Sequence, residues 1–388
     1  MIEQKRFNRI MLPNSGGIMR EKKYKVALVS AGMITNAAHI PAYKNHPEAF
    51  ELCGIFDIRE EAARETAVRH GIPGVYTDFE KMLSEIEPDI VSICTPNLFH
   101  AEQTLTALRY GANVICEKPL ALKYAQAKEI FDLAKKMNRH VFPCQSMRFG
   151  KEIQAAKEIT DSGVLGDIYF GEISSTRRRG VPTWGMFHIK ERSGGGAFCD
   201  LGVHMIDSFL WISGNPRMKS ISGNMTTKIA NQPDQLRTSL ADSGAPQGVF
   251  TPRPYDYREF DVEEFAAGSI RFENGMSVNF KVAWALNCPD SHHMNIIGDK
   301  SGLSIPDMNI YGGLGSFQTD MKPRIIDDSP FSQKKFNGHW GLMEQVLQTL
   351  DGFAPPLVTP EEALNVVAII DGFYRSAEAG REIMMEEV

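Results

Sequence analysis

The chain has 388 residues, of which 43% are hydrophobic, and a formal net charge of −6. This length predicts two domains, each with a sizeable core. The acidic balance argues against a nucleic acid or an anionic membrane as partner, and no apolar run approaches the ~20 residues of a membrane span. Six scattered cysteines without a C-x-x-C motif are typical of reduced core residues in a cytoplasmic protein.

Residues 1–22 form a basic segment that contains a breaker cluster at 13–17. The apolar stretch 10–12 is too short for the hydrophobic region of a signal peptide. We expect a flexible N-terminal arm, and the sequence leaves open whether translation starts at Met1 or Met19.

Buried-type strands and helices alternate between residues 23 and 145. The strands are expected at 25–30, 52–56, 89–94, 112–116 and 140–144, with helices at 35–43, 60–70, 78–83, 99–110 and 123–137. This α/β pattern predicts a doubly wound parallel sheet, a Rossmann domain that ends near Gln145.

Residues 146–388 have a different pattern. Helices are expected at 151–162 and 202–212, a strand at 168–176, and half-buried strands at 220–228, 266–272, 276–284 and 294–298. Asn274-Gly275 is typical of a hairpin turn. The pattern predicts an α+β domain with a large, mostly antiparallel open sheet, a terminal helix at 360–378, and a long polar loop at 231–258 that serves as a lid or a subunit contact.

The turn after the first strand is a degraded G-x-G-x-x-G in which only Gly32 remains. Such a glycine lets the backbone approach a pyrophosphate at the helix N-terminus, although a bare strand-to-helix turn is the alternative. Asp57 follows the second strand, where a carboxylate accepts hydrogen bonds from ribose hydroxyls and disfavours a 2′-phosphate. We therefore expect NAD rather than NADP, a preference that Arg59 weakens.

Glu117-Lys118-Pro119 follows the apolar run 112–116. Ligands of open parallel sheets bind outside the carboxyl ends of the strands. A cation at this position is placed for hydride chemistry at a nicotinamide, and a lysine that merely caps a strand is the alternative.

Asp200 and His204 are four residues apart and share one face of the expected helix. A histidine of near-neutral pKa is a suitable proton acceptor, and a nearby carboxylate can orient it or bind a substrate hydroxyl. The alternatives are a capping aspartate with a buried histidine, or a zinc pair, for which the sequence offers no convincing third ligand.

Arginines and tryptophans suit a polyhydroxylated ring, and four of them follow or end strands of the second half. The solvated edge of a sheet is the alternative for the run 177–179, and His292-His293 is expected at the surface. The predicted substrate-binding residues are Arg179, Trp184, Arg192, Asp200, His204 and Trp284.

From residue 25 to about 381 the chain resembles the Gfo/Idh/MocA oxidoreductases, the glucose-fructose oxidoreductase and inositol dehydrogenase group. The matching stretches are 31–41, Asp57, 95–97 with His100, 117–119 and 194–207. The resemblance implies that Lys118 stabilises the developing alkoxide, His204 takes the hydroxyl proton and Asp200 binds or orients. Ser30 and Thr35 depart from the family pattern. The implied cofactor contacts are Ser30, Gly32, Met33, Ile34, Asp57, Thr95, Asn97, His100, Glu117, Lys118 and Gln145.

The resemblance further implies an NAD-dependent dehydrogenase that oxidises a secondary ring hydroxyl of a sugar, glycoside or cyclitol to a ketone. Oxidation at C3 of a glycoside would feed a partner lyase. One alternative is an NAD-dependent glycoside hydrolase that borrows and returns the hydride, and another is a non-enzymatic dinucleotide-sensing regulator. We also expect a homo-oligomer formed through the second sheet, in which Ala266, Ser269 and Phe272 alternate with Ile270 and suggest two buried faces.

Overall fold

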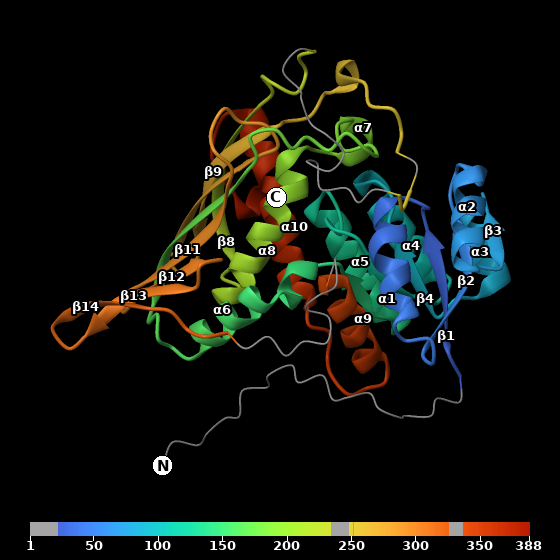
Figure 1. The fold of residues 1–388 in the computed structure, drawn as a ribbon, viewed down its shortest axis with the longest axis horizontal. Coiled ribbons are helices and arrows are strands. Elements are labelled where there is room, and N and C mark those ends of the chain that lie inside the picture. Colours follow the sequence, from blue (N-terminus) through green and yellow to red (C-terminus); the bar gives the residue numbers. More distant parts are fainter. Residues whose placement is uncertain (1–21, 234–247, 251, 326–336) are drawn as a thin grey trace.

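The computed structural model describes residues 22–233, 248–250, 252–325 and 337–388. The described residues form two β-sheets, called sheet A and sheet B, with helices packed between and around them (Figure 1). The expected N-terminal arm and most of the expected loop at 231–258 lie outside the described residues.

Sheet A has six strands in the order β3-β2-β1-β4-β5-β6, and every pair is parallel. This confirms the predicted doubly wound sheet. The short strand β3 was not predicted, because three half-buried residues carry little periodicity. The strands are β1 (Tyr24–Val29), β2 (Phe50–Phe56), β3 (Gly74–Tyr76), β4 (Ile90–Ile93), β5 (Asn113–Cys116) and β6 (Val141–Pro143).

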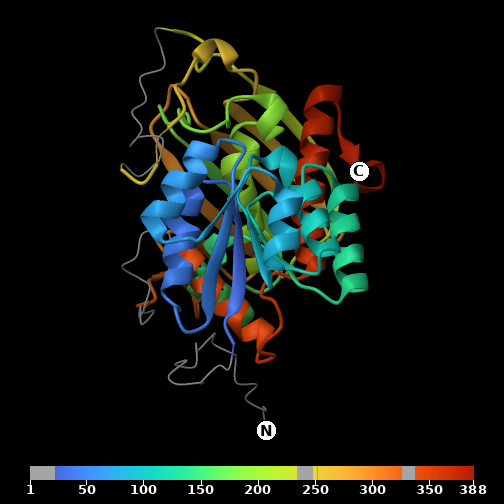
Figure 2. The ribbon, with the colours of Figure 1, turned by 90° about the vertical axis from the view of Figure 1, so that its right-hand side faces the viewer.

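Helices cover both faces of sheet A (Figure 2). Their ends have local causes: Gly71 ends α2 in a left-handed conformation, and the Asp78 side chain accepts the backbone N–H of Lys81 to cap α3. The first helix begins as a π-helical turn. The elements are η1 (Thr35–His39), α1 (Ile40–Lys44), α2 (Glu60–His70), α3 (Phe79–Ile86), η2 (Asn97–Phe99), α4 (His100–Arg109) and α5 (Tyr124–Met137).

Sheet B has nine strands in the order β14-β13-β12-β11-β7-β10-β9-β8-β15. Only the β7–β10 pair is parallel among the described pairs, so the predicted, mostly antiparallel sheet is confirmed. Gly275 turns the β9–β10 hairpin with φ +89°. The strands are β7 (Ile168–Thr176), β8 (Met218–Thr226), β9 (Phe265–Phe272), β10 (Ser277–Ala283), β11 (Ser291–Gly298), β12 (Gly302–Ile305), β13 (Asn309–Leu314), β14 (Phe317–Met321) and β15 (Ile383–Met384).

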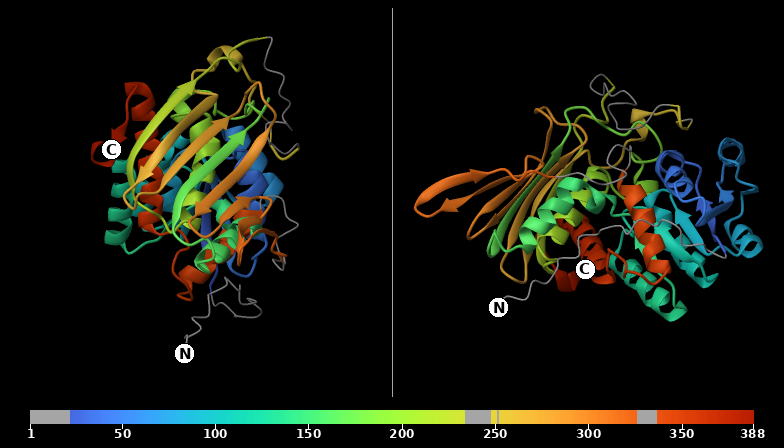
Figure 3. Two further views of the ribbon diagram at one scale, coloured as in Figure 1. Left: turned by 90° about the vertical axis from the view of Figure 1, so that its left-hand side faces the viewer. Right: turned by 60° about the horizontal axis from the view of Figure 1, so that its bottom comes forward.

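One face of sheet B is buried within the chain, not two. Ala266, Ile270 and Phe272 point to the inner, fully covered face, whereas Ser269 and Arg271 lie on the outer face. The expected grouping of Ser269 with Ala266 and Phe272 was wrong, because side chains alternate strictly along a strand. No described helix covers the outer face (Figure 3, left).

Helices α6, α8 and α10 of the second half pack on sheet B. Helix α9, which was not predicted, lies against sheet A, where Leu342 and Met343 join a core cluster with Ile40 and Tyr43. The elements are η3 (Ser146–Phe149), α6 (Lys151–Asp161), α7 (Lys190–Ser193), η4 (Phe198–Gly202), α8 (Val203–Ile212), η5 (Tyr257–Glu259), α9 (Asn337–Leu350), α10 (Pro360–Ala379) and η6 (Met385–Glu387).

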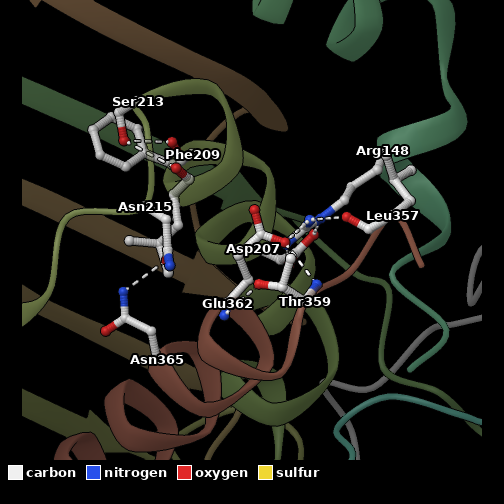
Figure 4. Close-up of polar contacts among 10 residues, drawn as sticks. Arg148, Asp207, Phe209, Ser213, Asn215, Leu357, Thr359, Glu362 and Asn365 are labelled. Carbon is white, nitrogen blue, oxygen red and sulfur yellow. Dashed lines mark hydrogen bonds and ion pairs between the residues drawn. The ribbon is translucent and has the colours of Figure 1, made fainter. Parts of the chain in front are cut away.

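A buried arginine joins the two halves just after sheet A ends (Figure 4). Arg148 of η3 has no exposed surface and donates to both carboxylate oxygens of Asp207 on α8, at 2.9 and 2.7 Å. It also donates to Glu362 in the first turn of α10, at 2.7 Å. This bidentate ion pair sets the position of α8, the helix that carries His204.

The cysteines only partly match the prediction. Four of them are buried and all are free, whereas Cys53 is half-buried and Cys288 is exposed. None of the described helices is long and apolar enough to cross a membrane.

Candidate active site

An ion pair joins the two halves of the chain at the carboxyl edge of sheet A. The ammonium of Lys118, just past β5, lies 2.8 Å from Oδ1 of Asp200 in η4 and donates a second hydrogen bond to the Asp200 backbone carbonyl. The two side chains are only 14% and 17% exposed. Burial raises the pKa of Asp200, but Lys118 outweighs it, so the pKa lies below its usual value and the carboxylate stays ionised.

The second carboxylate oxygen of Asp200 is also hydrogen-bonded. The indole N–H of Trp284, a residue with no exposed surface, donates to Oδ2 at 2.9 Å. The expected substrate contact by Trp284 therefore becomes, in this structure, a contact to Asp200.

The turn that precedes Asp200 is also held tightly. The Glu263 carboxylate accepts the backbone N–H groups of Gly196 and Phe198 together with the hydroxyl of Tyr374. A Cβ on Gly196 would collide with the Glu263 backbone carbonyl, so this position requires glycine.

His204 lies one turn after Asp200, as the i, i+4 spacing predicts. Burial lowers its pKa to about 3, and the Lys118 charge adds to this effect, so the imidazole is neutral at physiological pH. Among the described residues, buried Nδ1 of His204 has no hydrogen-bond partner. Because Asp200 pairs with Lys118 and precedes His204 by one helical turn, the structure brings the three predicted catalytic residues together, and their roles stay predictions.

Glu117, next to Lys118, is held by two histidines that sequence reasoning missed. Oε1 of Glu117 lies 3.0 Å from Nε2 of His39 in η1 and 2.8 Å from Nε2 of His339 in α9. Burial raises the pKa of Glu117, but the hydrogen bonds from His339 and His39 outweigh it, and the pKa lies well below its usual value. The carboxylate is therefore a buried, hydrogen-bonded anion, and we call the three residues the His–Glu–His clamp.

These residues and Cys144 are also metal-ligand types, with ligand atoms within 4.8 Å of one another. Two ligands about 2.0 Å from a tetrahedral ion lie about 3.3 Å apart. The N–O separations in the clamp, 2.8 and 3.0 Å, are shorter than that and are ordinary for hydrogen bonds. We therefore interpret the group as a hydrogen-bond network.

The predicted cofactor residues at the end of β4 hold neighbouring segments together. His100 has no exposed surface, and its ring nitrogens lie 2.7 Å from the carbonyl of Pro119 and 2.8 Å from that of Thr95. Asn97 donates to the carbonyl of Ser193, at the start of the glycine-rich turn. In this structure His100 therefore fixes the loop that carries Lys118.

The first turn can accommodate a dinucleotide. Ser30 has φ +87°, the left-handed conformation that glycine usually supplies. A Cβ on Gly32 would meet only the Ser30 hydroxyl, at 3.4 Å, so its other side is open, as a pyrophosphate cradle requires. Met33 is buried and Ile34 half-buried in the start of the helix.

Asp57 is buried at the end of β2, where its two oxygens accept the backbone N–H groups of Ala31 and Arg59. At the end of β6, buried Oε1 of Gln145 lacks a partner among the described residues. An unpaired acceptor at a strand's carboxyl end suits an amide donor such as the nicotinamide carboxamide. The residues thus fit NAD.

Of the predicted sugar contacts outside the centre, Trp184 packs on Phe187 with ring centroids 4.6 Å apart, and its buried indole N–H has no partner among the described residues. Arg179 donates to Asn287, and Arg192 lies over the ring of Phe99 at 5.8 Å. Their substrate contacts remain predictions.

Only one of the missed residues left a signal in the sequence. His39 follows Gly32 by seven residues, two helical turns further on. Cys144 lies in an apolar strand like any core cysteine, and His339 approaches Glu117 from 222 residues away. Its neighbour Gly338 permits this approach, because a Cβ there would collide with the carbonyl of Ser146.

We predict that His339→Ala destabilises the protein by about 1–3 kcal/mol, because the buried Glu117 carboxylate loses one of its two imidazole donors. Urea unfolding monitored by fluorescence measures the loss. His339→Gln, which keeps an N–H donor, is the matched control and should lose clearly less. Equal losses in the two variants would show that packing, and not the hydrogen bond, is what the histidine supplies.

Comparison with known proteins accounts for this architecture. A model described as an oxidoreductase family with an NAD-binding Rossmann fold matches residues 24–144, and one described as the GFO/IDH/MocA C-terminal domain matches residues 153–304. The chain is 32% identical over 368 residues to the D-glucoside 3-dehydrogenase of Escherichia coli (strain K12), covering 94% of this chain and 98% of that protein.

Solved structures share the fold. GenD2 from gentamicin A biosynthesis in complex with NAD is 22% identical, with a TM-score of 0.73 over 95% of this chain and 98% of that one. Levoglucosan dehydrogenase in complex with NADH and levoglucosan is 19% identical, with a TM-score of 0.73 over 94% and 100%. On the family models and the full-length relative, this chain belongs to the Gfo/Idh/MocA family and is an NAD-dependent oxidoreductase.

Proposed function

We propose that this oxidoreductase oxidises a secondary ring hydroxyl of a sugar or glycoside to a ketone, and specifically C3 of a hexosyl ring in a glycoside. The observation that carries the proposal is the grouping of the Lys118–Asp200 ion pair with His204, whose neutral imidazole has no partner at Nδ1 among the described residues. The full-length similarity to a D-glucoside 3-dehydrogenase supports the choice of substrate and carbon.

In the proposed mechanism, NAD⁺, when bound, supplies the hydride acceptor. The neutral imidazole of His204 accepts the hydroxyl proton, and the Lys118 ammonium donates a hydrogen bond to the oxygen as negative charge develops there. Asp200 keeps Lys118 in position through the 2.8 Å ion pair, and Trp284 keeps Asp200 in position. The substrate loses a hydride and a proton, and its C–O bond becomes a carbonyl.

The test is a screen for NADH formation with glucose, methyl glucosides, a cyclitol and non-carbohydrate alcohols, with the ketone located by NMR. We expect NADH and a C3 ketone from glycosides. Turnover confined to non-carbohydrate alcohols would contradict the proposal, and cleavage of the glycosidic bond without NADH would favour a hydrolase.

In the same assay, Lys118→Ala should lower kcat by about 10²–10³-fold, because the oxyanion loses a preorganised donor. The control is Lys128→Ala on the exposed face of α5, where the lysine pairs with Asp132. It should keep full activity. Unchanged kcat in Lys118→Ala, with NAD still bound, would remove Lys118 from the mechanism.

The pH dependence of kcat/KM should report on His204. Protonation of the imidazole removes its acceptor, so kcat/KM falls as the pH falls through its pKa. With that pKa lowered from 6.5 to about 3, we expect a flat profile from pH 7 to about pH 5, and Lys118→Met should move the acid limb to higher pH. A wild-type limb at pH 6.5 or above would be inconsistent with the buried neutral imidazole.

We further propose that a lyase acts on the keto product.

We also propose that the chain forms a homo-oligomer through sheet B. The β13–β14 hairpin projects from the body of the molecule (Figures 1 and 3) and exposes Leu314 and Phe317, which are 74% and 75% accessible. Exposed apolar side chains on a projecting edge favour association. Light scattering should give a multiple of the chain mass that Leu314→Glu/Phe317→Glu reduces, and a monomeric wild type would rule the assembly out.

A further inference from the structure

A cavity of about 260 Å³ lies where η3, α6, α8, β11 and the first turn of α9 meet. Some of the lining residues are buried, and the others are half-buried or exposed; the buried ones are Ile153, Met205, Met294, Ile305, Gly338 and His339. The apolar lining comes from Met147, Ile153, Met205, Met294, Ile305 and Pro306.

This cavity adjoins the candidate active site. His339, which lines it, is one of the two histidines that hold Glu117 beside Lys118. Met205 directly follows His204 in α8, and Met147 follows Gln145 by two residues. A substrate whose reacting hydroxyl lies at His204 would therefore have the cavity within reach of its far end.

The methionine, isoleucine and proline part of the wall suits an apolar group better than a sugar ring. Each sugar hydroxyl buried without a partner would cost about 1–3 kcal/mol, and thioether, isoleucine and proline walls offer no strong donors or acceptors. Three of the wall residues are methionines, which adapt their shape to flat or irregular apolar groups.

The size limits the ligand further. Pockets that hold a complete drug-sized ligand are usually about 300–1,000 Å³. A space of about 260 Å³ is smaller, which fits one six-membered ring better than a ring together with a hexosyl unit. The lining also has polar side chains, which make a ring with a hydroxyl substituent compatible with it: Ser146, Glu152, His292, His293, Asn337 and His339.

We propose that this cavity is an aglycone subsite, which binds the apolar, ring-sized aglycone of a glycoside while its sugar is held at Lys118 and His204. The proposal rests on the function proposed above and narrows it from glycosides in general to glycosides with a hydrophobic aglycone. Transfer of the aglycone from water into the cavity supplies the selectivity, since burial of apolar surface is favourable.

The first test compares kcat/KM for methyl, cyclohexyl and phenyl glucosides, with both anomers of each. We expect cyclohexyl and phenyl glucosides to exceed the methyl glucoside by about tenfold or more, a difference that a few buried methylenes provide. The cyclohexyl compound separates burial from any electronic effect of an aromatic aglycone.

The second test fills the cavity. Met147→Trp should lower kcat/KM for the phenyl and cyclohexyl glucosides at least about tenfold and leave the methyl glucoside within about twofold. Met147→Leu, of similar volume, is the matched control and should keep the wild-type ratio. If Met147→Trp does not fold, as judged by circular dichroism and NAD binding, Ile153→Phe fills the same cavity from α6.

The outcomes distinguish the two proposals. Equal kcat/KM for the three aglycones, or a preference that the filling variants do not change, would overturn the aglycone subsite while NADH from the methyl glucoside still supports glycoside oxidation. The absence of NADH formation with every carbohydrate would instead overturn the proposed function itself, and the subsite with it.

Discussion

The Lys118–Asp200 ion pair is the interaction on which the candidate site depends. It connects the carboxyl edge of sheet A with the helix that carries His204, and each partner is fixed independently. His100 holds the Lys118 loop through the carbonyl of Pro119, and Trp284 holds the free oxygen of Asp200. Because both charges are mostly buried, loss of either one would leave the other without compensation, which is far more costly than loss of a surface pair.

Burial and pairing give neighbouring titratable groups different protonation states. Glu117 and Asp200 stay ionised because histidine and lysine donors outweigh their desolvation, whereas His204 stays neutral because burial and Lys118 both lower its pKa. The centre therefore combines two fixed anions, one cation and one neutral base. This charge arrangement suits the proposed oxidation of an alcohol, in which the hydroxyl oxygen loses a proton and the carbon that carries it loses a hydride.

The contacts that hold the candidate site together also determine where the proposed aglycone subsite lies. Arg148 and the His–Glu–His clamp hold η3, α8 and α9 together, and the cavity is the space that remains between them. His292 is exposed, as the sequence predicted, and His293 is half-buried; both contribute to that lining. In the proposed function, Lys118, Asp200 and His204 carry out the reaction, and the cavity lining sets the selectivity for the aglycone. The aglycone preference could therefore change without altering the reaction.

Local patterns in the sequence were sufficient for much of this protein. Alternating buried strands and helices predicted sheet A, the Asn274-Gly275 turn predicted the β9–β10 hairpin, and the four-residue spacing placed Asp200 and His204 on one face. These features depend on contacts between near neighbours, which periodicity records. Strands β3 and β12 to β15 and helix α9 were missed. Short strands such as β3, β12 and β15 have little period, and α9 takes its stability from packing on sheet A.

The sequence by itself determined the fold class and most of the chemical groups of the site. Only the tertiary structure decided which groups meet: Lys118 with Asp200 across 82 residues, and Glu117 with His339 across 222. It also moved Trp284 from an expected substrate contact to a buried partner of Asp200. The physical reason is that residue type sets what a side chain can do, whereas its partner depends on how distant segments pack, which no local spacing specifies.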